Sequence, residues 1–153
     1  PHCNVLAFEV YRPAIARMLG YLVRQGLDNV RIVEADAVAG MEHLLPPQSV
    51  DAIWTFFPDP WPKPRHHKRR LLTPGFAAMA TSRMKAGATW RIATDSADYA
   101  DSMRNVLDND PRLASQHPTV WAPRWEARPI TQFEQRALDA GRRIFDLAYR
   151  RVG

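Results

Sequence analysis

The sequence predicts an α/β fold built on a mostly parallel, doubly wound sheet. Two observations support this prediction. Apolar runs of strand length alternate with amphipathic segments of helical length through most of the 153 residues, which is typical of consecutive βαβ units. Acidic residues also stand at or just after the ends of four successive predicted strands, where open α/β sheets bind ligands. With 46% hydrophobic residues, the chain can bury the core of one domain, residues 1–153.

The predicted elements are bounded by residues that start or stop regular structure. Pro13 suits a first helical turn and Gly26 a helix end. Thr73 and Ser96 are expected to cap the third and fourth helices, and Gly87 to precede a strand. Strands are expected at residues 5–10, 30–34, 50–57, 89–94 and 143–150, and helices at residues 14–25, 38–45, 74–84 and 96–109.

The last part of the chain is less regular. Four prolines between residues 111 and 130 predict an irregular or edge segment. Thr131 with Glu134 three residues later predicts a capping box at the start of a fifth helix. In the final strand, Ile144, Asp146 and Ala148 are expected to point outward, and this strand is the candidate for an antiparallel partner.

One stretch, residues 56–70, stands out by rigidity and charge. Pro58 and Pro60 restrict Asp59, because each proline fixes its own φ and pushes the preceding residue towards extended geometry. The chain has 21 Lys and Arg against 16 Asp and Glu, a net charge of +5. Residues 63–70 hold five cations and no acid, so this segment carries the whole excess. Such a run is usually a solvated surface, but beside a rigid aspartate it favours a clamp for nucleic-acid phosphates.

Composition excludes several other classes of protein. The single cysteine, Cys3, allows no internal disulfide, and the chain has neither an apolar run of membrane-spanning length nor a signal-peptide pattern. A pI near 9.9 without a basic amphipathic helix favours nucleic acid over a membrane surface. Since the chain starts at Pro1 and enters a strand almost at once, we expect that an upstream part of the domain is lacking.

Three of the acids at strand ends have an ordinary and a functional interpretation. Glu9 could accept hydrogen bonds from ribose hydroxyls or be an exposed glutamate. Asp36 could bind an adenine amino group or cap the next helix, and capping is again the alternative for Asp95.

The segment Phe57-Pro58-Asp59-Pro60-Trp61-Pro62-Lys63, followed by His66-His67-Lys68-Arg69-Arg70, resembles the signature of bacterial tRNA (guanine-N7-)-methyltransferases. Segments 8–13, 28–30, 35–37, 131–134 and 146–149 are also similar to that family. The resemblance implies a Rossmann-like class I methyltransferase fold. It also implies methyl transfer from S-adenosyl-L-methionine to N7 of a guanine in the tRNA variable loop, by a cytoplasmic protein, monomeric or homodimeric, without metal and without membrane.

The resemblance also implies a role for individual residues. It makes Asp59 catalytic and assigns cofactor binding to Glu9, Asp36 and Asp59. It assigns substrate binding to Lys63, Asp95, Thr131, Gln132, Phe133 and Glu134. It assigns tRNA binding to Arg65, His66, His67, Lys68, Arg69 and Arg70.

One departure from the family keeps alternatives open. None of the seven glycines are two residues apart, so the glycine-rich turn that holds the methionine end of the cofactor is missing. We expect it, with a central strand, upstream of Pro1. The main alternative is a non-catalytic RNA-binding fragment or subunit. A metal nuclease would need an acid where Pro62 stands, and a nicotinamide oxidoreductase could use Glu9 but would leave the basic segment unexplained. Adjacent histidines in an extended segment point apart, which argues against a metal on His66 and His67.

Overall fold

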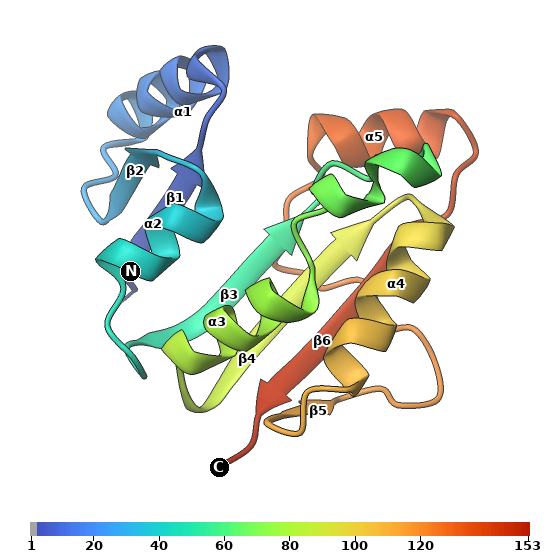
Figure 1. Cartoon of the computed structure of the whole chain (residues 1–153). Helices are drawn as coiled ribbons and strands as arrows, with labels where there is room; N and C mark the ends of the chain where they lie inside the picture. Colours follow the sequence, from blue (N-terminus) through green and yellow to red (C-terminus); the bar gives the residue numbers. More distant parts are fainter. Residues whose placement is uncertain (1–2) are drawn as a thin grey trace. The chain divides into compact units, whose positions relative to one another are not determined.

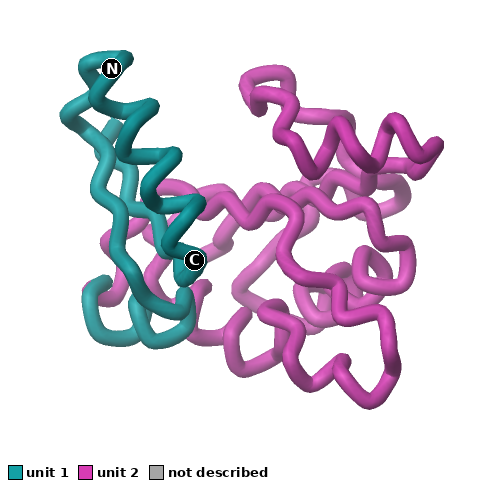
Figure 2. Tube along the Cα trace, turned by 90° about the horizontal axis from the view of Figure 1, so that it is seen from above, with its two compact units in different colours: residues 1–45 teal, residues 46–153 magenta. Residues whose placement is uncertain are grey.

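The computed structural model describes residues 3–153, and the chain forms two compact units, residues 1–45 and 46–153 (Figures 1 and 2). Each unit has its own β-sheet, two-stranded in the first and four-stranded in the second. The α/β class and the parallel pairing of successive strands are confirmed, because β1 (Val5–Glu9) pairs parallel with β2 (Val30–Glu34) and β3 (Val50–Phe56) with β4 (Met84–Thr94). No helix within residues 3–153 is long and apolar enough to cross a membrane.

The first unit is a βαβα unit. It consists of β1 (Val5–Glu9), α1 (Arg12–Gln25), β2 (Val30–Glu34) and α2 (Ala37–Leu44). Gly26 ends α1 at φ 62°, a left-handed conformation that glycine adopts without steric cost. Only Gly40 and Met41 are buried among residues 3–45, so this unit has a small core where α2 packs against β1.

The second unit has the strand order β3-β4-β6-β5. β6 is antiparallel to both of its neighbours, as expected for the last strand. The helices α3 and α4 lie on one face of the sheet, and α5 and the 3₁₀ helix η1 lie near the ends of β3 and β4 (Figure 1). The strands are β3 (Val50–Phe56), β4 (Met84–Thr94), β5 (Leu113–Ser115) and β6 (Phe145–Arg151), and the helices are η1 (Pro64–Arg69), α3 (Pro74–Arg83), α4 (Ala97–Asp108) and α5 (Gln132–Asp139).

The core of the second unit lies between the sheet and the helices α3 and α4. Trp90 of β4 and Tyr99 and Met103 of α4 are completely buried. The indole Nε1 of Trp90 donates a hydrogen bond to Thr55 Oγ1 at 3.0 Å, so its only polar atom is satisfied. A rigid sheet with a satisfied core therefore supports the carboxyl end of β3, where Asp59 follows.

Two expectations about strands are wrong. β4 begins at Met84 rather than at residue 89, because the pairing shifts between Val50–Met84 and Ala52–Thr89, and Gly87 lies inside this irregularity at φ 78°. A bulge of this kind adds residues to one strand without ending it. In β6, Asp146 and Ala148 do not point outward to solvent, because residues 146–149 are all buried. The strand lies in the interior of the sheet, and Arg128 covers Asp146.

Replacing Gly40 by alanine should destabilise the protein by about 1–3 kcal/mol, because the new Cβ would lie 2.4 Å from two ring carbons of Phe8. Without a clash, the same change inside a helix stabilises by up to about 1 kcal/mol. Gly75 of α3 has open space around its Cα and is the matched control. Urea unfolding should show a lower midpoint for Gly40→Ala and an unchanged or higher one for Gly75→Ala. A higher midpoint for both would contradict the packing of α2 on β1.

Candidate active site and basic segment

The turn after β3 presents Asp59 on a strained backbone. Phe57 donates its backbone N–H to Ala93 O at 2.8 Å, which continues the pairing of β3 with β4 past the end of the strand. Phe57 has φ 51° and Trp61 has φ 43°, a left-handed conformation that bulky residues rarely adopt. Asp59 lies between them and is exposed. Asp59 thus follows the carboxyl end of a parallel strand, as the sequence predicts, but β3 is only partly buried, with Trp54 46% exposed.

Arg70 ties this turn to α4 and is buried, with only 5% of its side chain exposed. Its Nε donates to the carbonyl oxygen of Pro60 at 2.9 Å. Its Nη2 donates to Asp98 and, at 3.1 Å, to His67 Nε2. The guanidinium carbon also lies 4.7 Å from the ring centre of Tyr99. This differs from the expected surface position, since in this conformation all of these groups are engaged within the protein.

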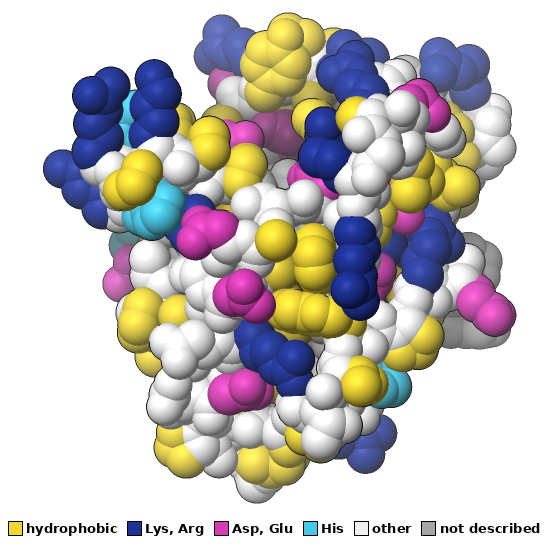
Figure 3. Space-filling model, turned by 90° about the vertical axis from the view of Figure 1, so that its right-hand side faces the viewer, with side chains coloured by type: hydrophobic (Ala, Val, Ile, Leu, Met, Phe, Trp, Pro, Cys, Tyr) yellow, Lys and Arg dark blue, Asp and Glu magenta, His cyan; other side chains and the backbone are white. Residues whose placement is uncertain are grey.

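The other cations of the basic segment lie at the surface. Arg65, Lys68 and Arg69 are exposed, and η1 begins after Lys63, which is exposed as well. The guanidinium of Arg69 lies 5.0 Å above the Trp61 ring. Figure 3 shows one face of the molecule, on which Lys and Arg side chains gather beside a histidine in the upper left. The exposed cations are therefore placed where a polyanion could reach them.

Trp61 is enclosed by its neighbours in the same segment. His66 meets its ring edge-on, with ring centres 5.9 Å apart, and Arg65 Nε donates to His66 Nε2 at 3.3 Å. The indole is half-buried. Together with Arg69, these contacts occupy part of the ring surface, so a nucleobase that stacked on Trp61 would have to displace them.

A second buried arginine supports the start of the same turn. The guanidinium of Arg128 is completely buried and lies 5.3 Å and 5.5 Å from the ring centres of Phe56 and Phe57. Its Nη1 lies 3.2 Å from Glu134 Oε2, and its Nη2 lies 3.1 Å from each carboxylate oxygen of Asp146. Two carboxylate partners and two aromatic faces balance the charge of this buried cation, although its Nε and Nη1 make no hydrogen bond. The network joins α5 and β6 to the end of β3.

The position of Glu134 corrects the predicted capping box. Thr131 Oγ1 accepts a hydrogen bond from the backbone N–H of Glu134 at 3.1 Å, so Thr131 does cap α5. The Glu134 side chain does not reach back to Thr131. It is 1% exposed and lies 2.8 Å from Arg124 Nε, besides its contact with Arg128. A buried ion pair with two arginines outweighs one cap hydrogen bond.

The remaining residues of the predicted substrate site are accessible to different degrees. Gln132 and Phe133 are exposed on the first turn of α5, the latter by 65%. Asp95 follows β4 and pairs with Arg142 at 2.8 Å. The structure thus assigns Asp59, Lys63, Asp95 and residues 131–134 to the second unit, with Glu134 alone among them buried.

The predicted cofactor acids Glu9 and Asp36 belong to the first unit. Glu9 Oε1 accepts hydrogen bonds from the backbone N–H groups of Val10 and Tyr11, both at 2.8 Å. Asp36 Oδ1 accepts from Val38 at 2.9 Å and Ala39 at 3.3 Å, so Asp36 caps α2. In each carboxylate the second oxygen has no hydrogen bond within residues 3–153, which leaves it free to accept one from a ligand.

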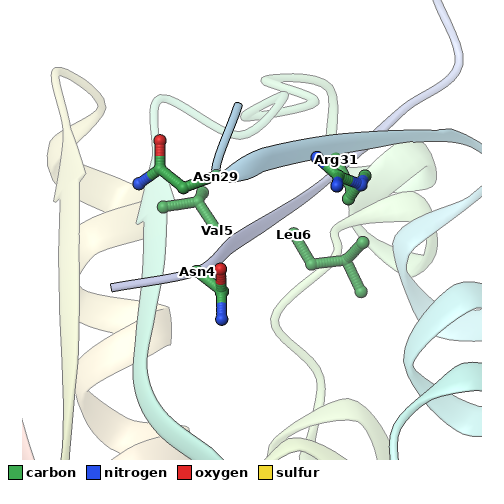
Figure 4. A pocket seen from close by; sticks show the side chains of 5 residues that line it. All are labelled: Asn4, Val5, Leu6, Asn29 and Arg31. Carbon is green, nitrogen blue, oxygen red and sulfur yellow. The ribbon is translucent and has the colours of Figure 1, made fainter. Parts of the chain in front are cut away.

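A hollow of about 280 Å³ in the first unit is separate from these acids. It is lined by Asn4, Val5, Leu6, Asn29 and Arg31 (Figure 4). These residues lie at the amino ends of β1 and β2, whereas Glu9 pairs with Glu34 at the carboxyl ends. Since parallel sheets bind ligands at the carboxyl ends of their strands, the hollow is not part of the candidate site. The described residues also contain no group of three side chains that could hold a metal ion.

Tyr99 and Arg128 are the supporting residues that sequence reasoning missed. Burial raises the pKa of the Tyr99 hydroxyl, and the charge on Asp59 adds to this effect. The hydroxyl accepts a hydrogen bond from the backbone N–H of Leu72 at 3.0 Å. For Arg128, the one sequence feature that could have indicated a supporting role is its place among prolines and tryptophans. Such a segment is expected to be irregular and therefore to need long-range contacts to fix it.

Comparison with known proteins places this chain in a methyltransferase family. The methyltransferase family model Methyltransf_4 matches residues 1–147. The tRNA (guanine-N(7)-)-methyltransferase of a Nocardioides species is 52% identical over 100% of this chain and 60% of its own length. The enzyme of the same name from Cutibacterium acnes is 47% identical over 99% of this chain and 56% of its own length. The chain thus spans less than two thirds of these relatives.

Two solved structures share the fold. An rRNA methylase from Streptococcus thermophilus has a TM-score of 0.62 at 14% identity, covering 98% of this chain and 74% of its own. A SAM-dependent O-methyltransferase from Thermotoga maritima has a TM-score of 0.60 at 16% identity, covering 98% of this chain and 50% of its own. The Rossmann-like methyltransferase fold expected from the sequence is therefore confirmed.

Burial raises the pKa of Asp146 to about 6, although Arg128 opposes the shift. The native carboxyl therefore keeps a proton at pH 5 that the unfolded chain releases. The stability that this group contributes is present below pH 4 and is lost as the pH rises to about 6, by roughly 3 kcal/mol in total. The unfolding free energy of the wild type, minus that of Asp146→Asn, should therefore fall between pH 4 and pH 6. Asp101→Asn, at an exposed position of α4, is the control, and a flat difference for Asp146→Asn would contradict the buried carboxyl.

Proposed function

The chain belongs to the methyltransferase family that matches residues 1–147, and we propose that the whole protein methylates N7 of a guanine in the variable loop of tRNA, with S-adenosyl-L-methionine as the methyl donor. The observation that carries this proposal is the exposed Asp59, which lies on a rigid turn next to the exposed cations of η1. The relatives that match the whole chain are named for this reaction. We propose the cytoplasm as its location, because its proposed substrate is tRNA.

The acids of the first unit fit the nucleoside part of the cofactor. Glu9 and Asp36 each keep one carboxylate oxygen without a hydrogen bond within residues 3–153, at the carboxyl end of a parallel pair. Glu9 would accept from the ribose hydroxyls and Asp36 from the adenine amino group. Since the sequence contains no G-x-G turn, no residue of this chain accounts for the methionine end.

When bound, S-adenosylmethionine supplies a methyl group on a positively charged sulfur. Guanine N7 carries a lone pair and no proton, so no side chain has to act as a base on it. Asp59 would accept hydrogen bonds from guanine N1–H and N2–H₂ and offset the positive charge that N7 gains. Catalysis then rests on orientation and electrostatics, which a carboxylate on a rigid turn supplies.

The basic segment would hold the tRNA through its phosphates. Arg65, Lys68 and Arg69 are exposed on one short 3₁₀ helix that follows the Asp59 turn. Lys63, Asp95 and the exposed Gln132 and Phe133 would contact the nucleotide that is methylated. Thr131 contributes by capping α5, and Glu134 would have to leave its ion pairs with Arg124 and Arg128 to bind substrate directly.

The deciding experiment is nucleoside analysis of unmodified tRNA after incubation with S-adenosylmethionine and the full-length product of the gene, with this 153-residue chain in parallel. We expect new 7-methylguanosine from the full-length product. Tight tRNA binding without methylation would favour the second candidate, a non-catalytic RNA-binding protein. The exposed cations of η1 support that candidate, because they could bind tRNA phosphates without a cofactor.

Asp59→Asn in the full-length protein should lower kcat by at least about 100-fold and leave tRNA affinity unchanged. The amide keeps the size of the side chain but presents N–H donors to the donors of guanine and cannot offset positive charge. Asp101→Asn, an exposed acid on α4, should retain full turnover. Near-normal turnover by Asp59→Asn would show that Asp59 is not the catalytic carboxylate.

Neutralising Arg65 and Lys68 together with glutamine should weaken tRNA binding and flatten its dependence on salt. Each lost phosphate contact lowers the slope of log K against log salt by about 0.7–0.9, so we expect a total of roughly 1.5. The control neutralises Lys85 and Arg150, two exposed cations outside the segment. If both double variants show the same slope as the wild type, the segment does not bind phosphates.

A further inference from the structure

We propose that Arg70 is a positioning residue for Asp59 and does not bind tRNA phosphates, although it belongs to the same basic run as the exposed cations. This inference rests on the proposed function, because it assigns Asp59 the catalytic role. It divides residues 65–70 into cations that face solvent and one buried cation that fixes the geometry of the turn.

The contrast in burial separates Arg70 from its neighbours. Its side chain is 5% exposed, whereas Arg65, Lys68 and Arg69 are all exposed. A phosphate can be gripped only by a guanidinium that it can reach. For Arg70 to do so, the side chain would have to break its contacts and leave its site, which would release the turn.

The contacts of Arg70 converge on the backbone next to Asp59. The acceptor of its Nε–H, Pro60 O, is the carbonyl of the residue that directly follows Asp59. Because prolines have no N–H, Pro58, Pro60 and Pro62 cannot donate to a ladder or turn hydrogen bond. The side chain of Arg70 thus supplies a donor to a turn that is short of backbone donors.

The other end of Arg70 is anchored on a rigid helix. Asp98 and Tyr99 both belong to α4, and Tyr99 is completely buried. The hydrogen bond from Arg70 holds the pKa of Asp98 below its ordinary value, so the partner stays ionised. Tyr99 in turn accepts from Leu72 N–H at 3.0 Å, which fixes the chain just beyond Arg70. Two contacts therefore fix this region to α4, that of Arg70 with Asp98 and that of Leu72 with Tyr99.

This arrangement requires arginine. A planar guanidinium can donate in several fixed directions while its face stacks on an aromatic ring. Here the donors serve Pro60, Asp98 and His67 and the face lies on Tyr99. A lysine could keep the charge near Asp98 but could not make the directional contact with Pro60 at the same time. Arg70→Lys should therefore rescue the fold and only a small part of the activity.

The test compares Arg70→Gln and Arg70→Lys with Arg69→Gln in the full-length protein. For the Arg70 variants we expect kcat at saturating tRNA to fall by roughly 10–100-fold, with tRNA Kd and its salt slope unchanged. For Arg69→Gln we expect the opposite result in binding, a weaker Kd and a smaller salt slope. If Arg70→Gln weakens tRNA binding, reduces the salt slope and keeps kcat, Arg70 is a phosphate ligand and the inference is overturned.

Asp98→Asn provides a variant that does not threaten folding, since this side chain is 69% exposed and its ion-pair partners are Arg70 and, at 3.7 Å, His67 Nε2. We expect it to lower kcat in the same direction, and less than additively when it is combined with Arg70→Lys. Additive effects would mean that the two residues act independently, which contradicts the proposal.

Amide hydrogen exchange separates this inference from the proposed reaction. The backbone amides of Phe57 and Leu72 report on the two ends of this region, because each donates a hydrogen bond, Phe57 to Ala93 O at 2.8 Å and Leu72 to the Tyr99 hydroxyl at 3.0 Å. Faster exchange at these residues in Arg70→Lys, and not in Lys85→Gln, an exposed cation outside the segment, supports the positioning role even if the wild type forms no 7-methylguanosine. Unchanged exchange in the Arg70 variants overturns it, whatever the reaction is.

Discussion

The left-handed backbone at Phe57 and Trp61 is the constraint on which the candidate site depends. Each such conformation costs about 1–3 kcal/mol for a bulky residue and persists only where its surroundings enforce it. Here two buried arginines do so, Arg128 through the rings of Phe56 and Phe57 and Arg70 through the carbonyl of Pro60. Asp59 is exposed between these two supports, so its position is set by contacts on either side and not by its own.

The burial of these two guanidinium groups determines which acids are paired within the protein and which could bind a ligand. An arginine that loses its water needs carboxylate or carbonyl partners. Glu134 and Asp146 serve Arg128, and Asp98 serves Arg70. These acids are therefore part of the scaffold in this conformation. Asp59, in contrast, has no ion pair within residues 3–153, which suits a carboxylate that must meet a ligand.

The same segment combines anchoring with attraction of a polyanion. The octet 63–70 carries the whole net charge of +5, but its members differ in what they contact. Arg69 covers the Trp61 ring and remains exposed, whereas Arg70 turns inward. The end of the 3₁₀ helix explains the difference, because η1 ends at Arg69 and Arg70 leaves the helical conformation at ψ 136°. The exposed cations thus end one residue before the arginine that holds the turn.

Periodicity, prolines and capping residues were sufficient to predict the α/β class, most element boundaries and the place of Asp59 after a strand end, since these depend on neighbours along the chain. The pattern also predicted the caps at Thr73, Ser96 and Thr131 and gave capping as one of two roles for Asp36. It misjudged Glu134, Asp146 and Arg70, which sequence position marked as a cap partner, an outward side chain and a surface cation. Their burial was decided by contacts between segments 10 to 28 residues apart. A pattern of charge along the chain counts such residues, but only the packed fold brings each one to its partner and removes it from water.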